Sequence, residues 1–140
     1  MKKSRLKIDY DYDFQLIGIA TTLKGYRLAW ELNNRLQLHL VRQPDLNVHN
    51  KGEHPAQYQY YLQETAIGHY RLFRNKPEEN DAAKWALVQE HTHFDFILMI
   101  EMDAEDVGKQ VLEQLKNIPS IELAAFIPLS SLKSKDDFIF

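Results

Sequence analysis

The chain contains no cysteine, only five glycines among 140 residues, and no long run of apolar residues. Without cysteine there is no disulfide framework, no thiolate nucleophile and no cysteine-ligated zinc site, so a reducing compartment is favoured. The glycines form neither a dinucleotide-binding G-x-G-x-x-G motif nor a Walker loop. No serine lies in a G-x-S-x-G nucleophile elbow. The usual sequence signs of nucleotide, thiol and serine chemistry are therefore missing.

Charge and hydropathy exclude further classes. The apolar run at residues 96–100 is far shorter than the ~20 residues of a membrane-spanning helix. The basic start MKKSRLK meets acidic residues from Asp9 onward, before any apolar segment, so we expect no signal peptide. Lys and Arg total 17 against 20 for Asp and Glu, which leaves a net charge of -3 and no overall basic field for nucleic acid. We expect a cytoplasmic protein with no membrane partner, and the sequence predicts no cofactor.

What is present indicates one globular domain over residues 1–140, because 44% of the residues are hydrophobic and 26% are charged. The pattern predicts strands at residues 8–22, 38–48, 57–63 and 68–74, one or two strands within 84–102, and a last strand at 121–127. Helices are expected at residues 23–37 and 103–118. This order predicts an α+β fold: a mainly antiparallel or mixed sheet of about five to seven strands with two helices packed on one face.

Local signals refine these elements. Pro44 should confine its strand to an edge or make its pairing irregular. Gly68 marks a hairpin turn. Thr21 or Thr22 is expected to cap the first helix, and Asp103 the second. The second helix should bury a stripe of apolar residues against the sheet. The apolar end of the tail at residues 128–140 suggests that the tail packs on the rest of the domain. The residues of that stripe are Val107, Val111, Leu115 and Ile118.

The segment EHTHFDFILMIEMD, residues 90–103, poses the sharpest question about chemistry. If it is a strand, His91, His93 and Asp95 lie on one face at two-residue spacing, and two imidazoles with a carboxylate suit zinc, iron or manganese. The alternative is an exposed strand face with histidines near their ordinary pKa of about 6.5. Because no further ligand is identified, the exposed strand is favoured over the metal site.

A second constellation is acidic. Glu90 and Asp95, with Asp9, Asp11 or Asp13 from the first strand, could do acid and base work or hold a hard cation. Alternatively, Asp95 accepts hydrogen bonds from backbone or side-chain donors beside buried aromatic residues, and its loss would cost about 1 to 3 kcal/mol. We favour this structural role.

Aromatic residues suggest two contact surfaces. Tyr70, Arg71, Phe73 and Arg74 alternate as in sheets that stack single-stranded bases, although the full RNP1 pattern is absent and nucleic acid is disfavoured. Trp30 and Trp85, with Tyr26, could line a pocket, but aromatic residues at such spacing are more often core. We therefore expect these three side chains to be buried.

Three segments resemble, in order, landmarks of the IPExxxVDY family of small bacterial proteins: YDFQLIGIATTLKGYRLAWELN, VQEHTHFDFILMI and LKSKDDFIF. The middle segment matches the motif as Val88, Gln89, Glu90, three free positions, Phe94, Asp95 and Phe96. Gln89 replaces the proline of the family name. The resemblance implies one fold over nearly the whole chain and a structural role for the motif positions Glu90, Phe94, Asp95 and Phe96. It implies no activity, cofactor or catalytic residue.

Two functions remain open. The first is a non-catalytic protein-interaction module whose sheet face or edge binds another protein, with a homo-oligomer as one form, because Tyr and Arg are enriched at interfaces. The second is a small metal- or carboxylate-dependent enzyme that uses the segment from Glu90 to Asp95. The absence of a recognisable catalytic set favours the interaction module.

Overall fold

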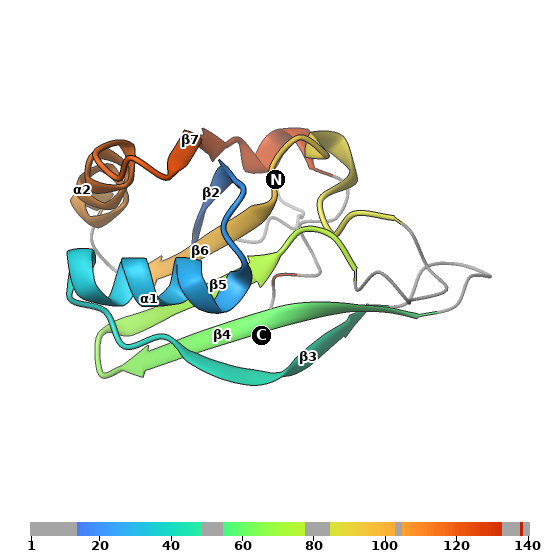
Figure 1. The fold of residues 1–140 in the computed structure, drawn as a ribbon, viewed down its shortest axis with the longest axis horizontal. Coiled ribbons are helices and arrows are strands. Elements are labelled where there is room, and N and C mark those ends of the chain that lie inside the picture. The colour runs from blue at the N-terminus through green and yellow to red at the C-terminus, as the bar shows by residue number, and fades with distance from the viewer. Residues whose placement is uncertain (1–13, 49–54, 78–84, 103–104, 133–137, 139–140) are drawn as a thin grey trace, which may run out of the picture.

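The computed structural model describes residues 14–48, 55–77, 85–102, 105–132 and 138. The strands of the described sheet are β2 Gln15–Thr21, β3 Val41–Val48, β4 Ala56–Thr65, β5 Gly68–Arg74, β6 Phe96–Met102 and β7 Ile121–Ile127. The helices are α1 Gly25–Leu36 and α2 Glu105–Lys116, with short 3-10 helices η1 Gln89–His91 and η2 Leu129–Ser131. The strand order is β3-β4-β5-β6-β2-β7, and each neighbouring pair is antiparallel (Figure 1). The predicted α+β class is confirmed.

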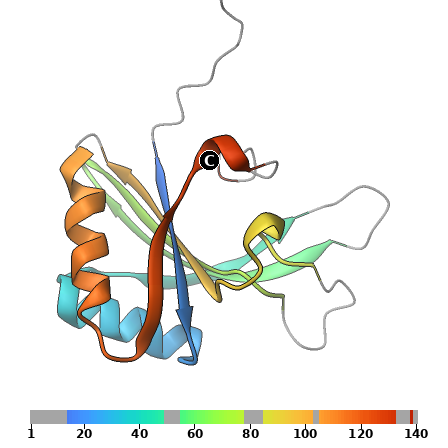
Figure 2. The same ribbon diagram turned by 90° about the horizontal axis from the view of Figure 1, so that it is seen from above.

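Both helices cover the same face of the sheet, as predicted (Figure 2). The apolar stripe expected for α2 lies in the core, with Val111, Leu115 and Ile118 buried and Val107 packed against them. From α1, Leu28 and Leu32 are fully buried against the strands. Because apolar residues recur at helical spacing on both helices, one stripe of each helix can be removed from water.

The opposite face of the sheet is covered by irregular chain and 3-10 turns. Residues 85–94 and the C-terminal segment pack there, and Figure 2 shows η1 and η2 on the side away from α1 and α2. Phe138 is 1% exposed and Leu132 is 4% exposed on this face, so the docking predicted for the tail is confirmed at these two described residues. Residues 96–100 of β6 are therefore buried on both sides, which explains why this part of its sequence is continuously apolar.

The hairpin predicted at Gly68 joins β4 to β5. Gly68 has φ +154° and pairs with Met102, and a Cβ atom added there would lie 1.9 Å from the carbonyl oxygen of Glu101. Glycine is required because a side chain would collide with neighbouring backbone. At the β3 edge, the pairing with β4 shifts register between Gln43 and Leu46. This shift spans Pro44 and confirms the irregular edge strand expected from that proline.

The prediction that Thr21 or Thr22 caps the first helix is wrong. Lys24 is the N-cap residue of α1, and it makes no side-chain cap hydrogen bond. Thr21 instead donates its hydroxyl to the carbonyl oxygen of Ser120 at 2.7 Å and accepts the amide of Leu23 at 3.2 Å. Thr21 lies before the start of the helix, and its hydroxyl group connects the end of β2 with the start of β7. Asp103, the predicted cap of α2, lies outside the described residues.

Candidate functional site

The two histidines lie on a turn, which corrects the strand predicted for residues 90–95. His91 ends η1, His93 follows in the turn, and strand β6 begins only at Phe96. In a helical turn, residues two positions apart do not share a face, so the geometry assumed for a metal site is lost. The imidazole of His93 packs on Phe94 with ring centroids 4.1 Å apart. Within the described ranges, no three His, Asp or Glu side chains are placed to hold a metal ion.

Asn75 is the residue that makes residues 87–95 a turn. Its amide nitrogen donates to the carbonyl oxygens of His91 at 3.1 Å and Phe94 at 2.9 Å, and its side-chain oxygen accepts the amide of Val88 at 2.7 Å. Its backbone also accepts from Leu87 at 2.9 Å. These bonds occupy the polar groups that a further strand would have paired. Sequence analysis missed Asn75, since an asparagine after a strand signals a loop without naming its partners.

Asp95 connects three strands at the entrance to β6. One carboxylate oxygen accepts the amide of Thr21 at 2.9 Å, and the other accepts from Lys76 at 3.2 Å. Its backbone amide donates to Ile19, and its carbonyl oxygen accepts from Asn75, both at 2.8 Å. These contacts support the structural role proposed for Asp95, as an acceptor of backbone and side-chain donors.

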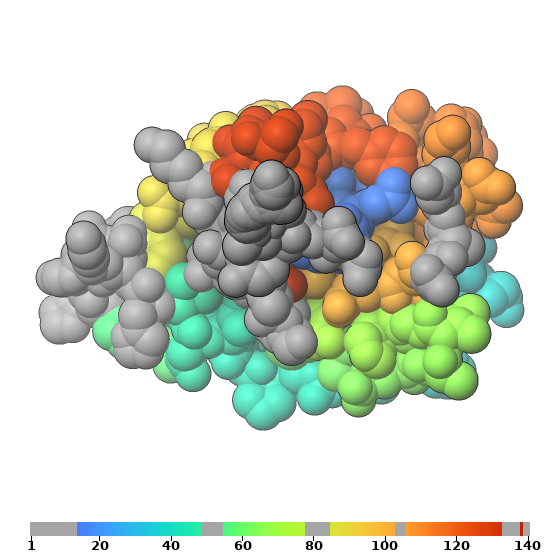
Figure 3. Space-filling model, turned by 180° about the vertical axis from the view of Figure 1, so that it is seen from behind, coloured from blue at the N-terminus to red at the C-terminus, as the bar shows by residue number. Residues whose placement is uncertain are grey.

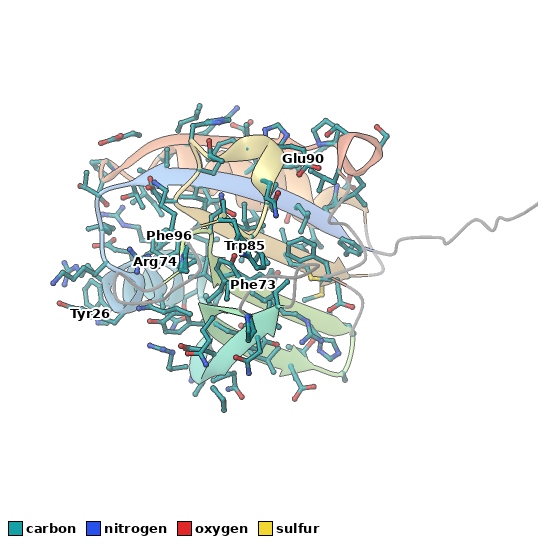
Figure 4. All side chains as sticks on the ribbon, turned by 90° about the vertical axis from the view of Figure 1, so that its right-hand side faces the viewer. Tyr26, Phe73, Arg74, Trp85, Glu90 and Phe96 are labelled. Carbon is teal, nitrogen blue, oxygen red and sulfur yellow. The ribbon has the colours of Figure 1, made fainter. Side chains whose placement is uncertain are left out.

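The other motif positions have different surroundings. Phe94 is buried over Gly18, where an added Cβ atom would lie 2.2 Å from the ring, so glycine is needed beneath it. Phe96 is buried on the helix-covered face. Glu90 is exposed on η1, and Figure 4 shows it on the opposite side of this view from Arg74 and Phe96. Asp9, Asp11 and Asp13, the other members of the predicted acidic group, lie outside the described residues.

The surface predicted from Tyr70, Arg71, Phe73 and Arg74 does not exist as one face. Tyr70 packs towards the helices, whereas Phe73 is fully buried on the other face. Arg71 is 8% exposed and donates to Glu101 at 2.7 Å and to the hydroxyl of Tyr60 at 2.5 Å. Burial opposes its charge, but these two hydrogen bonds outweigh burial and raise the pKa of Arg71. Tyr70, Arg71 and Phe73 are therefore committed to the fold and form no common platform for stacking bases.

The three aromatic residues expected in the core are placed differently. Trp85 is half-buried against Tyr58, with ring centroids 5.8 Å apart. Tyr26 and Trp30, however, are 69% and 51% exposed on α1. The guanidinium of Arg27 lies 4.4 Å from the ring centroid of Trp30. The prediction of burial is wrong for these two because they lie on the solvent side of a helix whose stripe is supplied by leucines.

The two edges of the sheet differ in their protection against pairing. β3 carries Pro44, an Arg42–Asp45 ion pair of 2.6 Å and a register shift, features that discourage another strand from adding. β7 has the sequence IELAAFI, with Glu122 as its one charge and with Leu123 and Phe126 exposed. Figure 3 shows β7 along the upper margin of the molecule, beside β2. The pairing of β7 with β2 shifts register between Ala20 and Thr21 and is continuous over residues 123–127. An apolar edge of this kind favours strand addition.

The direction of the free backbone groups on β7 follows from β2. The Ile19 carbonyl and the Thr21 amide both bond to Asp95 on the β6 side, so the even-numbered residues of β2 face β7. The residues of β7 that pair with these even-numbered residues are Leu123, Ala125 and Ile127, and their amides and carbonyls point towards β2. The outer edge is therefore formed by the amides and carbonyls of Ala124 and Phe126.

A polar cleft of about 880 Å³ opens at the start of α1. It is bounded by the end of β2, the end of β5 and the entrance to β6, and Asp95 lies in its wall. Figure 4 shows Arg74 beside Phe96, with Tyr26 nearby on α1. The basic residues in its wall are Lys24, Arg42, Arg74 and Lys76, and the acidic residues are Asp95 and Glu122.

We expect the Asp95→Ala substitution to lower the free energy of unfolding by about 1 to 2 kcal/mol, because the Thr21 amide loses its acceptor. The ion pair of Asp95 with Lys76 contributes little to this free energy, since the Lys76 side chain is 49% exposed. Urea unfolding of this variant beside His91→Ala and His93→Ala measures the difference. Equal unfolding free energies for all three variants would contradict the role given to Asp95.

The chain matches no family model, no curated protein and no solved structure. The resemblance to the IPExxxVDY family, the bacterial origin that it implies and the cytoplasmic location therefore stay predictions. Neither described helix has the length and apolar character needed to cross a bilayer.

Proposed function

We propose that this protein is a non-catalytic interaction module that binds an extended segment of a partner protein along β7. The observation that carries the proposal is the contrast between the two edges of the described sheet. β3 is interrupted by Pro44 and carries an ion pair, whereas β7 keeps one register with β2 over residues 123–127 and is apolar there. Strand addition uses the outward amides and carbonyls of the edge for affinity. Neighbouring side chains then select the sequence of the partner.

The exposed apolar side chains of β7 fit this role. Leu123 is 47% exposed and Phe126 is 37% exposed. Leu123 pairs with Ala20 and Phe126 with Ile17, so the two lie on opposite faces of the sheet. A strand paired with β7 would bring its side chains against both residues, because cross-strand neighbours lie within contact distance. The partner segment should therefore carry apolar side chains on both of its faces.

Phe126→Pro tests the proposal, because proline removes one outward amide without removing a bond to β2. The matched control is Phe126→Ala, which removes the ring and keeps the amide. In pull-downs from native extract at several salt concentrations, we expect wild type to retain a partner, Phe126→Ala to retain less, and Phe126→Pro to retain none above background. Amide exchange in the complex should slow at Ala124 and Phe126.

No partner above background with wild-type protein, or equal retention by Phe126→Pro, would contradict strand addition at β7. Melting temperatures of both variants must be compared first, since loss of binding is informative only for a folded variant. If Phe126→Pro unfolds, Leu123→Lys provides the second test, because it places a charge beside the added strand at a position that is 47% exposed.

A further inference from the structure

We infer that the cleft at the start of α1 is a binding site for a small, multiply charged anion that carries phosphate or carboxylate groups. The site meets β7 at Glu122 and does not depend on strand addition along residues 123–127. Its volume of about 880 Å³ is that of a small-molecule site. Polar groups from several elements line it, which is the arrangement needed to fix the orientation of a ligand.

The charge in the cleft has the opposite sign to that of the whole protein. Four basic side chains line it against two acidic ones, whereas the complete chain has a net charge of -3. These basic residues come from different parts of the chain: Lys24 precedes α1, Arg42 lies on β3, Arg74 ends β5, and Lys76 follows it. The fold thus concentrates positive charge that the sequence disperses. A concave surface of this sign raises the local concentration of anions.

The ion pairs within and beside the cleft are easily exchanged. Lys76 lies 3.2 Å from Asp95, and their side chains are 49% and 33% exposed. Arg42 lies 2.6 Å from Asp45, and its side chain is 47% exposed. Exposed pairs of this kind contribute only about 0 to 1 kcal/mol, so a ligand can replace a carboxylate at small cost. Asp95 keeps the Thr21 amide as a donor when Lys76 turns to the ligand.

Uncharged groups in the same wall give the site selectivity. The wall includes Gln59, Thr22, Tyr26 and Tyr61, whose amide and hydroxyl groups can bond to ligand oxygens. The first turn of α1 contains no acidic residue, so the positive end of its dipole is not opposed there. The four basic side chains remain the basis of the inference, and the helix adds to them.

Titration of isotope-labelled, full-length protein with pyrophosphate, inorganic phosphate and citrate, followed by NMR at constant ionic strength, tests the site. We expect saturable shifts at the amides of Thr22, Lys24 and Arg74. Stronger binding of pyrophosphate than of citrate would identify a phosphate ligand, and the reverse order would identify a polycarboxylate. Constant ionic strength matters because exposed charges are screened by added salt.

The cleft variant is Lys24→Gln with Arg74→Gln. Its control is Arg35→Gln with Lys109→Gln, which removes two exposed cations that do not line the cleft. We expect the cleft variant to weaken binding by about tenfold or more, and the control to stay within about twofold of wild type. If the cleft variant does not fold, Lys24→Gln alone replaces it.

Absence of saturable shifts up to about 10 mM of all three anions, or equal weakening of binding by the control variant, would overturn the inference. Phe126→Pro should bind these anions as wild type does, so the site and the β7 proposal can fail separately.

Discussion

The Phe138→Ala substitution should lower the free energy of unfolding by about 3 to 5 kcal/mol, which is the range for deleting a buried phenyl ring. Phe138 is 1% exposed although it lies near the C-terminus. Its ring centroid is 5.5 Å from that of Phe73 in an edge-on arrangement and 6.3 Å from that of Phe14. Removing the ring leaves a cavity against the sheet and ends both aromatic contacts. Denaturant unfolding monitored by circular dichroism measures the loss.

Phe126→Ala is the matched control for this substitution, because it deletes the same ring from a site that is 37% exposed. We expect a loss of less than about 1 kcal/mol there, as at other surface positions. If the two variants lost the same stability, Phe138 would not be an anchor of the core. The comparison separates burial of the ring from any general effect of removing phenylalanine.

The Asn75→Ala substitution should cost about 3 kcal/mol, because it strands three backbone groups at about 1 kcal/mol each. The affected groups are the Val88 amide and the carbonyl oxygens of His91 and Phe94. Asn75 is 0% exposed, so water cannot replace these partners without opening the turn. Urea unfolding gives the loss, and amide exchange at Val88 should accelerate.

Asn34→Ala serves as the control, since Asn34 also donates to a backbone carbonyl, that of Trp30 at 2.8 Å, but on the exposed side of α1. We expect it to change stability by less than about 0.5 kcal/mol. Asn75→Asp should lose most of the stabilisation, because a carboxylate keeps the acceptor for Val88 but cannot donate to two carbonyls. A stable Asn75→Asp variant would show that the donor bonds contribute little.

The helices and strands predicted correctly were those in which apolar residues recur with a strong local periodicity. The stripe from Val107 to Ile118 indicated α2, and the apolar stretch from residue 96 onward indicated a strand buried on both faces. Pro44 marked an irregular edge strand through its missing amide. Gly68 marked the hairpin turn, although the close contact that requires glycine there is with Glu101 on the neighbouring strand β6. Such signals survive folding because the same few residues create and satisfy them.

The candidate sites were predicted less well, because each depends on contacts distant in sequence. Residues 90–95 have a sequence that fits a strand, but Asn75 and the end of β2 bind their backbone and make a turn. The amide that Asp95 accepts belongs to Thr21, 74 positions away. Tyr26 and Trp30 fit a core pattern, yet leucines of the same helix fill the space under α1. The local periodicity of apolar residues does not indicate these long-range contacts.

By itself, the sequence determined an α+β chain with two amphipathic helices, a strand buried on both faces and a docked tail, because hydrophobic spacing specifies which faces leave water. Only the tertiary structure decided where the carboxylates and cations would meet. Strand order placed Lys24, Arg42, Arg74 and Lys76 around one cleft and left β7 at one edge of the described sheet. The physical reason is that burial depends on the spacing of residues along one element, whereas a binding site depends on which elements become neighbours.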